Sequence, residues 1–343
     1  MTEKNVPVEM PALPLRLGVV IIGRNEGERL RRCLASLAGQ ASWLVYVDSG
    51  SSDDSVALAA GLGAHVVDLD RNLPFTAARA RNIGFARLCD LDPNLDFVQF
   101  VDGDCEVVAS WIAKAAAQLA SDATLAVVCG RRRERYPEAS PYNRLCDIEW
   151  NTPIGLADAC GGDALMRVRP LSEVGGYNSD LIAGEEPDLC LRLRQRGWRI
   201  LRMDAEMTVH DANITRISQW WKRSVRSGHA YAEGFTRHRR EPGGYYASQV
   251  RSNLAWGAAL PVLVAGLALP SGGLSGLLLA GYAVLGLRVF KACRRRGFSA
   301  SDSRLYAWFC VLGKFPAAYG QLRYWTRLAL GRRSALIEYK SVG

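Results

Sequence analysis

The first half of the chain alternates between short apolar runs and segments whose apolar residues repeat at helical spacing. Residues 17–22, 43–47 and 97–101 are nearly continuous apolar runs, which predicts strands that are buried on both faces of a sheet. Between the first two runs, the apolar residues from Leu30 to Leu37 lie on one face of a predicted helix. Strands that alternate with helices form right-handed βαβ units, so the predicted fold class is α/β with a mostly parallel sheet.

Further segments extend this predicted α/β region by the same criteria of periodicity and capping. In chain order they are a helix capped by Ser52 or Asp53 and ending at Leu62, a strand at 65–67, a helix at 75–86, a strand at 125–130, a charged loop at 131–142 and a final strand at 198–201.

Two carboxylates follow the apolar run at residues 97–101 directly. Asp102 and Asp104 flank Gly103, which permits a tight turn close to a bulky ligand. Open α/β sheets bind ligands at the carboxyl ends of their strands, and hard oxygen ligands there suit Mg²⁺ or Mn²⁺. A polar turn after a strand is the alternative interpretation of an isolated Asp-X-Asp.

Other polar residues gather at the same predicted sheet edge: Asn25 and Glu26 after the first strand, and Asp48 after the second. An acidic side chain in this crevice can accept hydrogen bonds from a ribose or a base edge. The guanidinium of Arg81 suits a phosphate, and a solvated helix face is the alternative for this residue. The chain has neither Gly-X-Gly-X-X-Gly nor a Walker loop, so dinucleotide and P-loop chemistry are not indicated.

Four stretches, taken in this order, resemble glycosyltransferase family 2. They are Val-Val-Ile-Ile-Gly-Arg-Asn-Glu at residues 19–26, Val-Asp-Ser-Gly-Ser-Ser-Asp at 47–53, Ala-Arg-Asn-Ile-Gly at 80–84 and Val-Asp-Gly-Asp at 101–104. The resemblance covers roughly residues 15–234 and implies the GT-A fold and a nucleotide-diphosphate sugar donor.

The resemblance also implies roles for individual residues. It implies that Asn25, Glu26 and Asp48 line the nucleoside pocket and that Arg81 serves the nucleotide. It implies that Asp102 and Asp104 hold the divalent cation on the diphosphate. These six residues are the donor-binding and metal-binding candidates of the first half of the chain.

Two candidates in the second half also depend on the resemblance. Asp163 lies in a stretch that borders the sugar and the acceptor in this family, and we expect it to contact a sugar hydroxyl; a turn-forming Asp is the alternative. His210 follows the last predicted strand, where the family often has a histidine that completes the metal site. A structural histidine is the alternative.

A general base is expected where a helix begins at residues 184–189. Its first-turn carboxylates suit the helix dipole, which explains them without any catalytic role. An inverting transfer, however, needs a carboxylate beside the acceptor hydroxyl. The family usually has Glu-Asp followed, after one residue, by Asp, and here the second position is Glu186. Glu186 is therefore the predicted base, and Asp188 is the second candidate.

Residues 252–287 contain no charged residue and form two apolar segments divided at residues 270–273. At about 1.5 Å per residue each segment reaches roughly 20–25 Å, which is short of a ~30 Å bilayer core. Basic residues flank both ends, so we expect a hairpin with both ends in the cytoplasm. A buried pair of helices in a soluble domain is the alternative. Residues 305–330 are aromatic-rich and interrupted by charge, which favours an interfacial helix.

Composition narrows the class of protein further. Among 343 residues, 49% are hydrophobic and 22% charged, which excludes a disordered chain. The net charge is +9, and twelve Lys/Arg against two acidic residues from Arg288 onward give that region a surplus of ten. A basic nucleic-acid binder fits poorly because this surplus adjoins the apolar hairpin. Nine cysteines without a Cys-X-X-Cys pattern indicate reduced thiols facing the cytosol.

These observations predict a loose arm at residues 1–14 without a signal peptide, a GT-A domain at 15–235, a linker at 236–251 and a membrane-associated helical region with a basic tail at 252–343. The predicted activity is inverting transfer from a nucleotide-diphosphate sugar to a lipid-linked or glycan acceptor, with Mg²⁺ or Mn²⁺, beside membrane lipid at the cytoplasmic face. A nucleotidyltransferase on a similar fold and a non-catalytic membrane scaffold are the alternatives.

Overall fold

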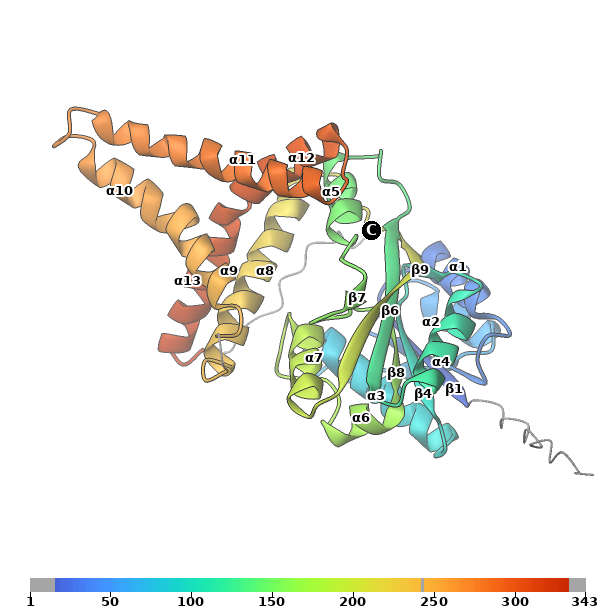
Figure 1. The fold of residues 1–343 in the computed structure, drawn as a ribbon. Coiled ribbons are helices and arrows are strands. Elements are labelled where there is room, and N and C mark those ends of the chain that lie inside the picture. The colour runs from blue at the N-terminus through green and yellow to red at the C-terminus, as the bar shows by residue number, and fades with distance from the viewer. Residues whose placement is uncertain (1–15, 242–243, 333–343) are drawn as a thin grey trace, which may run out of the picture.

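The computed structural model describes residues 16–241 and 244–332 (Figure 1). The predicted arm at residues 1–14 and the end of the basic tail lie outside the described residues. An α/β part carries the sheet, and the last third of the chain is helical and extends away from it (Figure 1).

The α/β part is built on one mixed, mostly parallel sheet with the strand order β3-β2-β1-β4-β8-β6-β9-β5, and β7 pairs with β9. Strands β1, β2, β3 and β4 are parallel neighbours, as the alternation of strands and helices predicts. Strand β8 runs antiparallel between β4 and β6. The strands are β1 (Leu17–Gly23), β2 (Trp43–Asp48), β3 (His65–Asp68), β4 (Phe97–Asp102), β5 (Cys105–Val107), β6 (Leu125–Glu134), β7 (Gly155–Leu156), β8 (Ala164–Arg167) and β9 (Arg199–His210).

Helices flank this sheet and bury the faces that their periodicity predicts. Helix α1 buries Leu30, Cys33, Leu34 and Leu37. Helix α2 begins after Asp54 rather than at a capping Ser52 or Asp53, although Asp53 Oδ1 accepts a hydrogen bond from Ser55 N. The helices are α1 (Glu28–Leu37), α2 (Ser55–Gly61), α3 (Ala77–Leu91), α4 (Trp111–Ser121), α5 (Pro141–Glu149), α6 (Val168–Glu173) and α7 (Glu185–Gln195).

Two strands are longer than the sequence pattern predicts. Strand β6 continues to Glu134 and α5 begins at Pro141, so the expected charged loop at 131–142 is confined to residues 135–140. Strand β9 runs without a break to His210. The two strands pair in parallel through this polar stretch, with Glu134 opposite His210. Their charged side chains are compensated by ion pairs, and hydropathy alone therefore does not reveal these strand ends.

The C-terminal helices include two that are long and apolar enough to cross a membrane, Ala247–Leu267 and Leu274–Arg295. Only 11% and 6% of the apolar stretches of these two helices are buried. This exposure contradicts the alternative of a pair of helices buried in a soluble domain. The two helices meet at a turn far from the sheet (Figure 1). The elements are α8 (Ile217–Arg237), α9 (Ala247–Leu254), the π-turn η1 (Ala255–Ala259), α10 (Leu260–Leu267), the 3₁₀ helix η2 (Leu274–Leu279), α11 (Ala280–Arg295), α12 (Ala300–Leu312) and α13 (Lys314–Ala329).

Both candidate spans are longer than the uncharged segments because the helices continue into their polar flanks. The interfacial helix expected at residues 305–330 is instead two helices, α12 and α13, that meet at Gly313. Helix α13 lies very close to α8. A Cβ atom on Gly228 would meet the carbonyl oxygen of Ala317 at 2.1 Å, and one on Gly320 would meet that of Val225 at 2.2 Å. Small residues therefore fix α8 to the C-terminal helices.

Helix α3 approaches the sheet equally closely at Gly84, where a Cβ atom would lie 2.4 Å from Val20 Cγ1 and 2.9 Å from Val47 Cγ2. We expect Gly84→Ala to lower the free energy of unfolding by about 1–3 kcal/mol, because both strands are closely packed. Thermal unfolding of the purified protein measures this. Gly61→Ala is the matched control, since no atom lies within 4 Å of a Cβ there. Equal stability of the two variants would contradict the close approach.

Candidate active site

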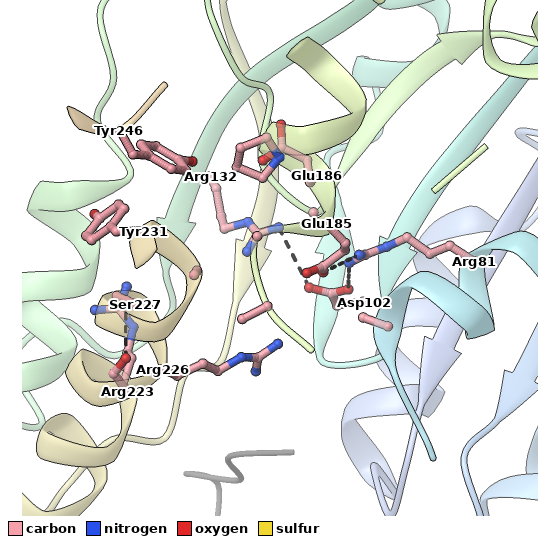
Figure 2. A pocket seen from close by; sticks show the side chains of 16 residues that line it. Arg81, Asp102, Arg132, Glu185, Glu186, Arg223, Arg226, Ser227, Tyr231 and Tyr246 are labelled. Atoms are coloured by element: carbon pink, nitrogen blue, oxygen red, sulfur yellow. Dashed lines mark hydrogen bonds and ion pairs between the residues drawn. The ribbon is translucent and has the colours of Figure 1, made fainter. Parts of the chain in front are cut away.

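A cleft of about 430 Å³ opens at the carboxyl edge of the sheet, between the α/β part and helix α8. One wall carries Arg81 from α3, Asp102 from the end of β4, Arg132 from β6, and Glu185 and Glu186 from the start of α7. The opposite wall carries Arg223, Arg226, Ser227 and Tyr231 from α8, together with Tyr246 (Figure 2). Charged groups of both signs therefore face a shared space.

Arg81 joins two carboxylates in this cleft. Its Nη2 donates to Asp102 Oδ1 at 2.9 Å and its Nη1 donates to Glu185 Oε1 at 2.9 Å (Figure 2). Burial alone lowers the pKa of Arg81, but Asp102, Tyr177 and Glu185 together raise it above its ordinary value. The guanidinium is therefore a permanent positive charge beside Asp102.

Arg132 is a second buried cation on the same wall, and sequence reasoning missed it because it fell in the expected loop. Its Nη2 lies 2.8 Å from Asp163 Oδ2 and 3.8 Å from Asp102 Oδ2. Its guanidinium also lies over the ring of Trp150. Burial lowers the pKa of Arg132, but Asp163 and other neighbours raise it by more, so that the pKa lies above its ordinary value. The signal in the sequence that could have indicated Arg132 is the run of three arginines, residues 131–133, directly after the apolar strand.

Asp163 is fully buried and is not among the residues that line the cleft. Its Oδ1 accepts from Asp102 N at 3.2 Å, and its Oδ2 accepts from Thr208 Oγ1 at 2.8 Å. With Arg132 it connects the ends of β4, β6 and β9. The geometry therefore places Asp163 beneath Asp102, rather than at the cleft surface where a sugar hydroxyl would reach it.

Asp104 and His210 lie together next to this cluster, with His210 Nε2 3.3 Å from Asp104 Oδ1. Both are buried, and the ring of Trp150 meets that of His210 edge-on. Burial, followed by the charge of Arg132, lowers the pKa of His210 to about 4, so its imidazole is neutral at pH 7. A neutral imidazole beside a carboxylate fits a divalent cation. Asp102, by contrast, faces guanidinium groups.

Asn25, Glu26 and Asp48 lie together at the ends of β1 and β2, outside the set that lines the cleft. Asp48 Oδ2 accepts from Ser51 N at 2.7 Å, and Asn25 Oδ1 accepts from Ser52 N at 2.7 Å. The first bond lies within the loop after β2, and the second joins that loop to the loop after β1. The three residues occupy the sheet edge on the β1–β2 side of Asp102.

The two candidate bases differ in position. Glu186 lines the cleft, and its Oε1 accepts from Cys160 N at 2.6 Å and from Cys190 Sγ at 3.0 Å. Asp188 does not line the cleft. Its two oxygens pair with Arg192 Nε at 2.9 Å and with His238 Nε2 at 2.7 Å. The structure therefore brings Glu186, and not Asp188, to the cleft.

The fold and the site together define a class of protein. Residues 18–175 match the family model described as glycosyl transferase family 2. The matched region contains all four motifs, which confirms that they resemble this family. Its sheet and helices form the GT-A fold.

Particular relatives refine this result. The chain is 28% identical over 238 residues to a pre-mycofactocin glycosyltransferase of Mycobacterium tuberculosis, covering 64% of this chain but only 47% of that protein. It is 23% identical over 219 residues to the O-antigen chain rhamnosyltransferase RfbN of Salmonella typhimurium, covering 59% and 68% of the two chains. The chain thus spans about half the length of the first of these relatives.

A solved structure shares the fold over most of the chain. The mannosyltransferase PcManGT from Pyrobaculum calidifontis superposes with a TM-score of 0.63 at 18% identity, covering 90% of this chain and 87% of that one. Because the match covers nine-tenths of the chain, it extends into the C-terminal helices.

Substitution of Arg132 tests the buried ion pairs. We expect Arg132→Met to lower the free energy of unfolding by about 3–5 kcal/mol, because Asp163 stays buried without its counter-ion. The matched control is Arg133→Met, whose side chain is 52% exposed and pairs with Glu206, and which should cost at most about 1 kcal/mol. Denaturant unfolding measures both variants. If Arg132→Met is as stable as the control, the buried pair does not stabilise the fold.

Proposed function

We propose that this protein is an inverting glycosyltransferase that moves a sugar from a nucleotide-diphosphate sugar to a membrane-associated acceptor at the cytoplasmic face of the cell membrane. The observation that carries the proposal is the cleft of a family 2 domain in which Glu186 lies on the same wall as the Arg81–Asp102 pair. The names of the relatives, a glycosyltransferase and an O-antigen chain rhamnosyltransferase, support the reaction class.

The donor would lie along the sheet edge. Asn25, Glu26 and Asp48 would contact the nucleoside, and Arg81 and Asp102 would meet the diphosphate and its cation. Asp104 and His210 would hold Mg²⁺ or Mn²⁺, which neutralises charge on the departing diphosphate when it is bound. The mannosyltransferase with the same fold was solved in complex with GDP-Man and Mn²⁺, which supports this kind of donor and ion.

Glu186 would act as the general base. Its Oε1 is held by Cys160 N and Cys190 Sγ, which fixes the orientation of the carboxylate at the cleft wall. The acceptor hydroxyl would lose its proton to this carboxylate as its oxygen forms a bond to the anomeric carbon. The bond from that carbon to the diphosphate oxygen breaks on the opposite face, so the configuration inverts.

The acceptor would come from the membrane side. Helix α8 forms the second wall of the cleft and packs on α13, within the same helical part as the two candidate spans. Basic residues precede the first span and end the second, which favours a cytoplasmic location of both ends. An acceptor attached to a lipid, or a glycan held at the membrane, would therefore approach the cleft past α8.

The base assignment gives a direct test. Glu186→Gln should slow transfer by roughly 10²-fold or more, the usual scale of general-base catalysis, and leave donor affinity nearly unchanged. Asp188→Asn is the control: its ion pairs lie outside the cleft, so it should cost stability more than rate. Single-turnover transfer and donor titration measure these effects. An inactive Asp188→Asn beside an active Glu186→Gln would assign the base to Asp188.

Removal of the cation tests the other half of the site. A chelator should abolish transfer, and added Mn²⁺ or Mg²⁺ should restore it, because the diphosphate would otherwise leave without charge compensation. Asp104→Asn should lose metal-dependent donor binding in a calorimetric titration while thermal unfolding stays near that of the wild type. Full turnover of Asp104→Asn with either ion would show that this carboxylate is not a ligand.

A further inference from the structure

Two buried thiols lie beside the carboxylate of Glu186, and neither takes part in the bonds that form and break in the proposed transfer. Cys160 precedes β8, and Cys190 lies one helical turn after Glu186 in α7. Their sulfur atoms are 3.6 Å apart, and Cys190 Sγ is 3.0 Å from Glu186 Oε1. One ligand atom of each residue lies within 4.8 Å of the other two.

This spacing matches three corners of a tetrahedral metal site. Two Zn–S bonds of about 2.3 Å at the tetrahedral angle place the sulfurs about 3.8 Å apart, and a Zn–O bond of about 2.0–2.2 Å places oxygen about 3.5–3.7 Å from each sulfur. The observed sulfur–sulfur distance of 3.6 Å and the Cys190 Sγ–Glu186 Oε1 distance of 3.0 Å lie within about 0.7 Å of these values. Small side-chain movements would therefore form the site.

The ligand set also selects the kind of ion. Thiolates prefer Zn²⁺ and similar soft cations, whereas Mg²⁺ and Mn²⁺ prefer carboxylate and water oxygens. The predicted cation site of Asp104 and His210 is separate, because neither residue belongs to this cluster. The two sites thus differ in residues and in chemistry.

We propose that Cys160, Glu186 and Cys190 bind one thiophilic divalent cation such as Zn²⁺ or Cd²⁺, and that this ion blocks transfer by occupying the carboxylate of Glu186. The inhibition rests on the proposed function, whereas the binding does not. The ion enters through the cleft, which Glu186 lines. Each metal–sulfur bond forms as the thiol proton leaves to solvent, and no electron is transferred.

Cys160, Glu186 and Cys190 therefore have a metal-free state and a metal-bound state, and Glu186 can act as the base only in the first. In the metal-free state the Cys190 thiol stays protonated and donates a hydrogen bond to Glu186 Oε1. The carboxylate then remains in place at the cleft wall. In the metal-bound state the same oxygen is a ligand. Burial raises the pKa of Cys190 to about 11, which favours the thiol whenever the ion is absent.

The test is a titration of the full-length protein in detergent with Cd²⁺, in excess Mg²⁺ and a non-thiol reductant. In the wild type, absorption from cadmium–thiolate bonds should rise until one equivalent of Cd²⁺ per protein has been added. The Cys160→Ser/Cys190→Ser double variant should give no such absorption. Cys146→Ser, a buried thiol in α5, is the matched control and should keep the signal. Asp104→Asn should keep it too, which separates this site from that of His210.

The proposal is overturned if the wild type gives no thiolate absorption, or if the double variant retains it. The rate of sugar transfer, assayed in parallel, should fall as the first equivalent of Cd²⁺ binds. Thiolate binding without any effect on measurable transfer would overturn the inhibitory role. Thiolate binding by a protein that transfers no sugar would leave the metal site standing and would count against the proposed function alone.

Discussion

A connected set of buried ion pairs at the carboxyl edge of the sheet determines the geometry of the whole site. Removing a guanidinium from water costs several kcal/mol, and the cost is recovered only where carboxylates face it. Arg81 therefore fixes Asp102 relative to Glu185, and Arg132 fixes Asp163. These pairs connect α3, β4, β6 and α7. Since Glu186 follows Glu185 directly, its position at the cleft depends on the same pairs.

The second constraint is the close packing of α8 on α13. Backbone contacts at Gly228 and Gly320 leave no space for larger side chains. The wall of the cleft that carries Arg226 and Tyr231 is consequently part of the same helical assembly as the candidate spans. Movement of the C-terminal helices and the shape of the cleft are therefore mechanically linked, which is consistent with the proposed approach of the acceptor past α8.

Most of the α/β part follows from local sequence signals. The strand ending at Asp102 and the apolar face of α1 were predictable because burial imposes simple periodicities. The extension of β6 to Glu134 and the role of Arg132 were not, since the charges on that strand are balanced by residues distant in the chain. The proximity of Cys160 and Cys190 likewise arises from tertiary packing, which no local pattern encodes.

The central claim is transfer of a sugar with inversion and release of the nucleotide as a diphosphate. Nuclear magnetic resonance of a reaction containing the full-length protein, a panel of nucleotide-diphosphate sugars, diamagnetic Mg²⁺ and membrane lipid extract detects both products at once. The account predicts one free nucleoside diphosphate for each sugar transferred, with the anomeric configuration opposite to that of the donor. Release of pyrophosphate, or a product with the configuration of the donor, would contradict it.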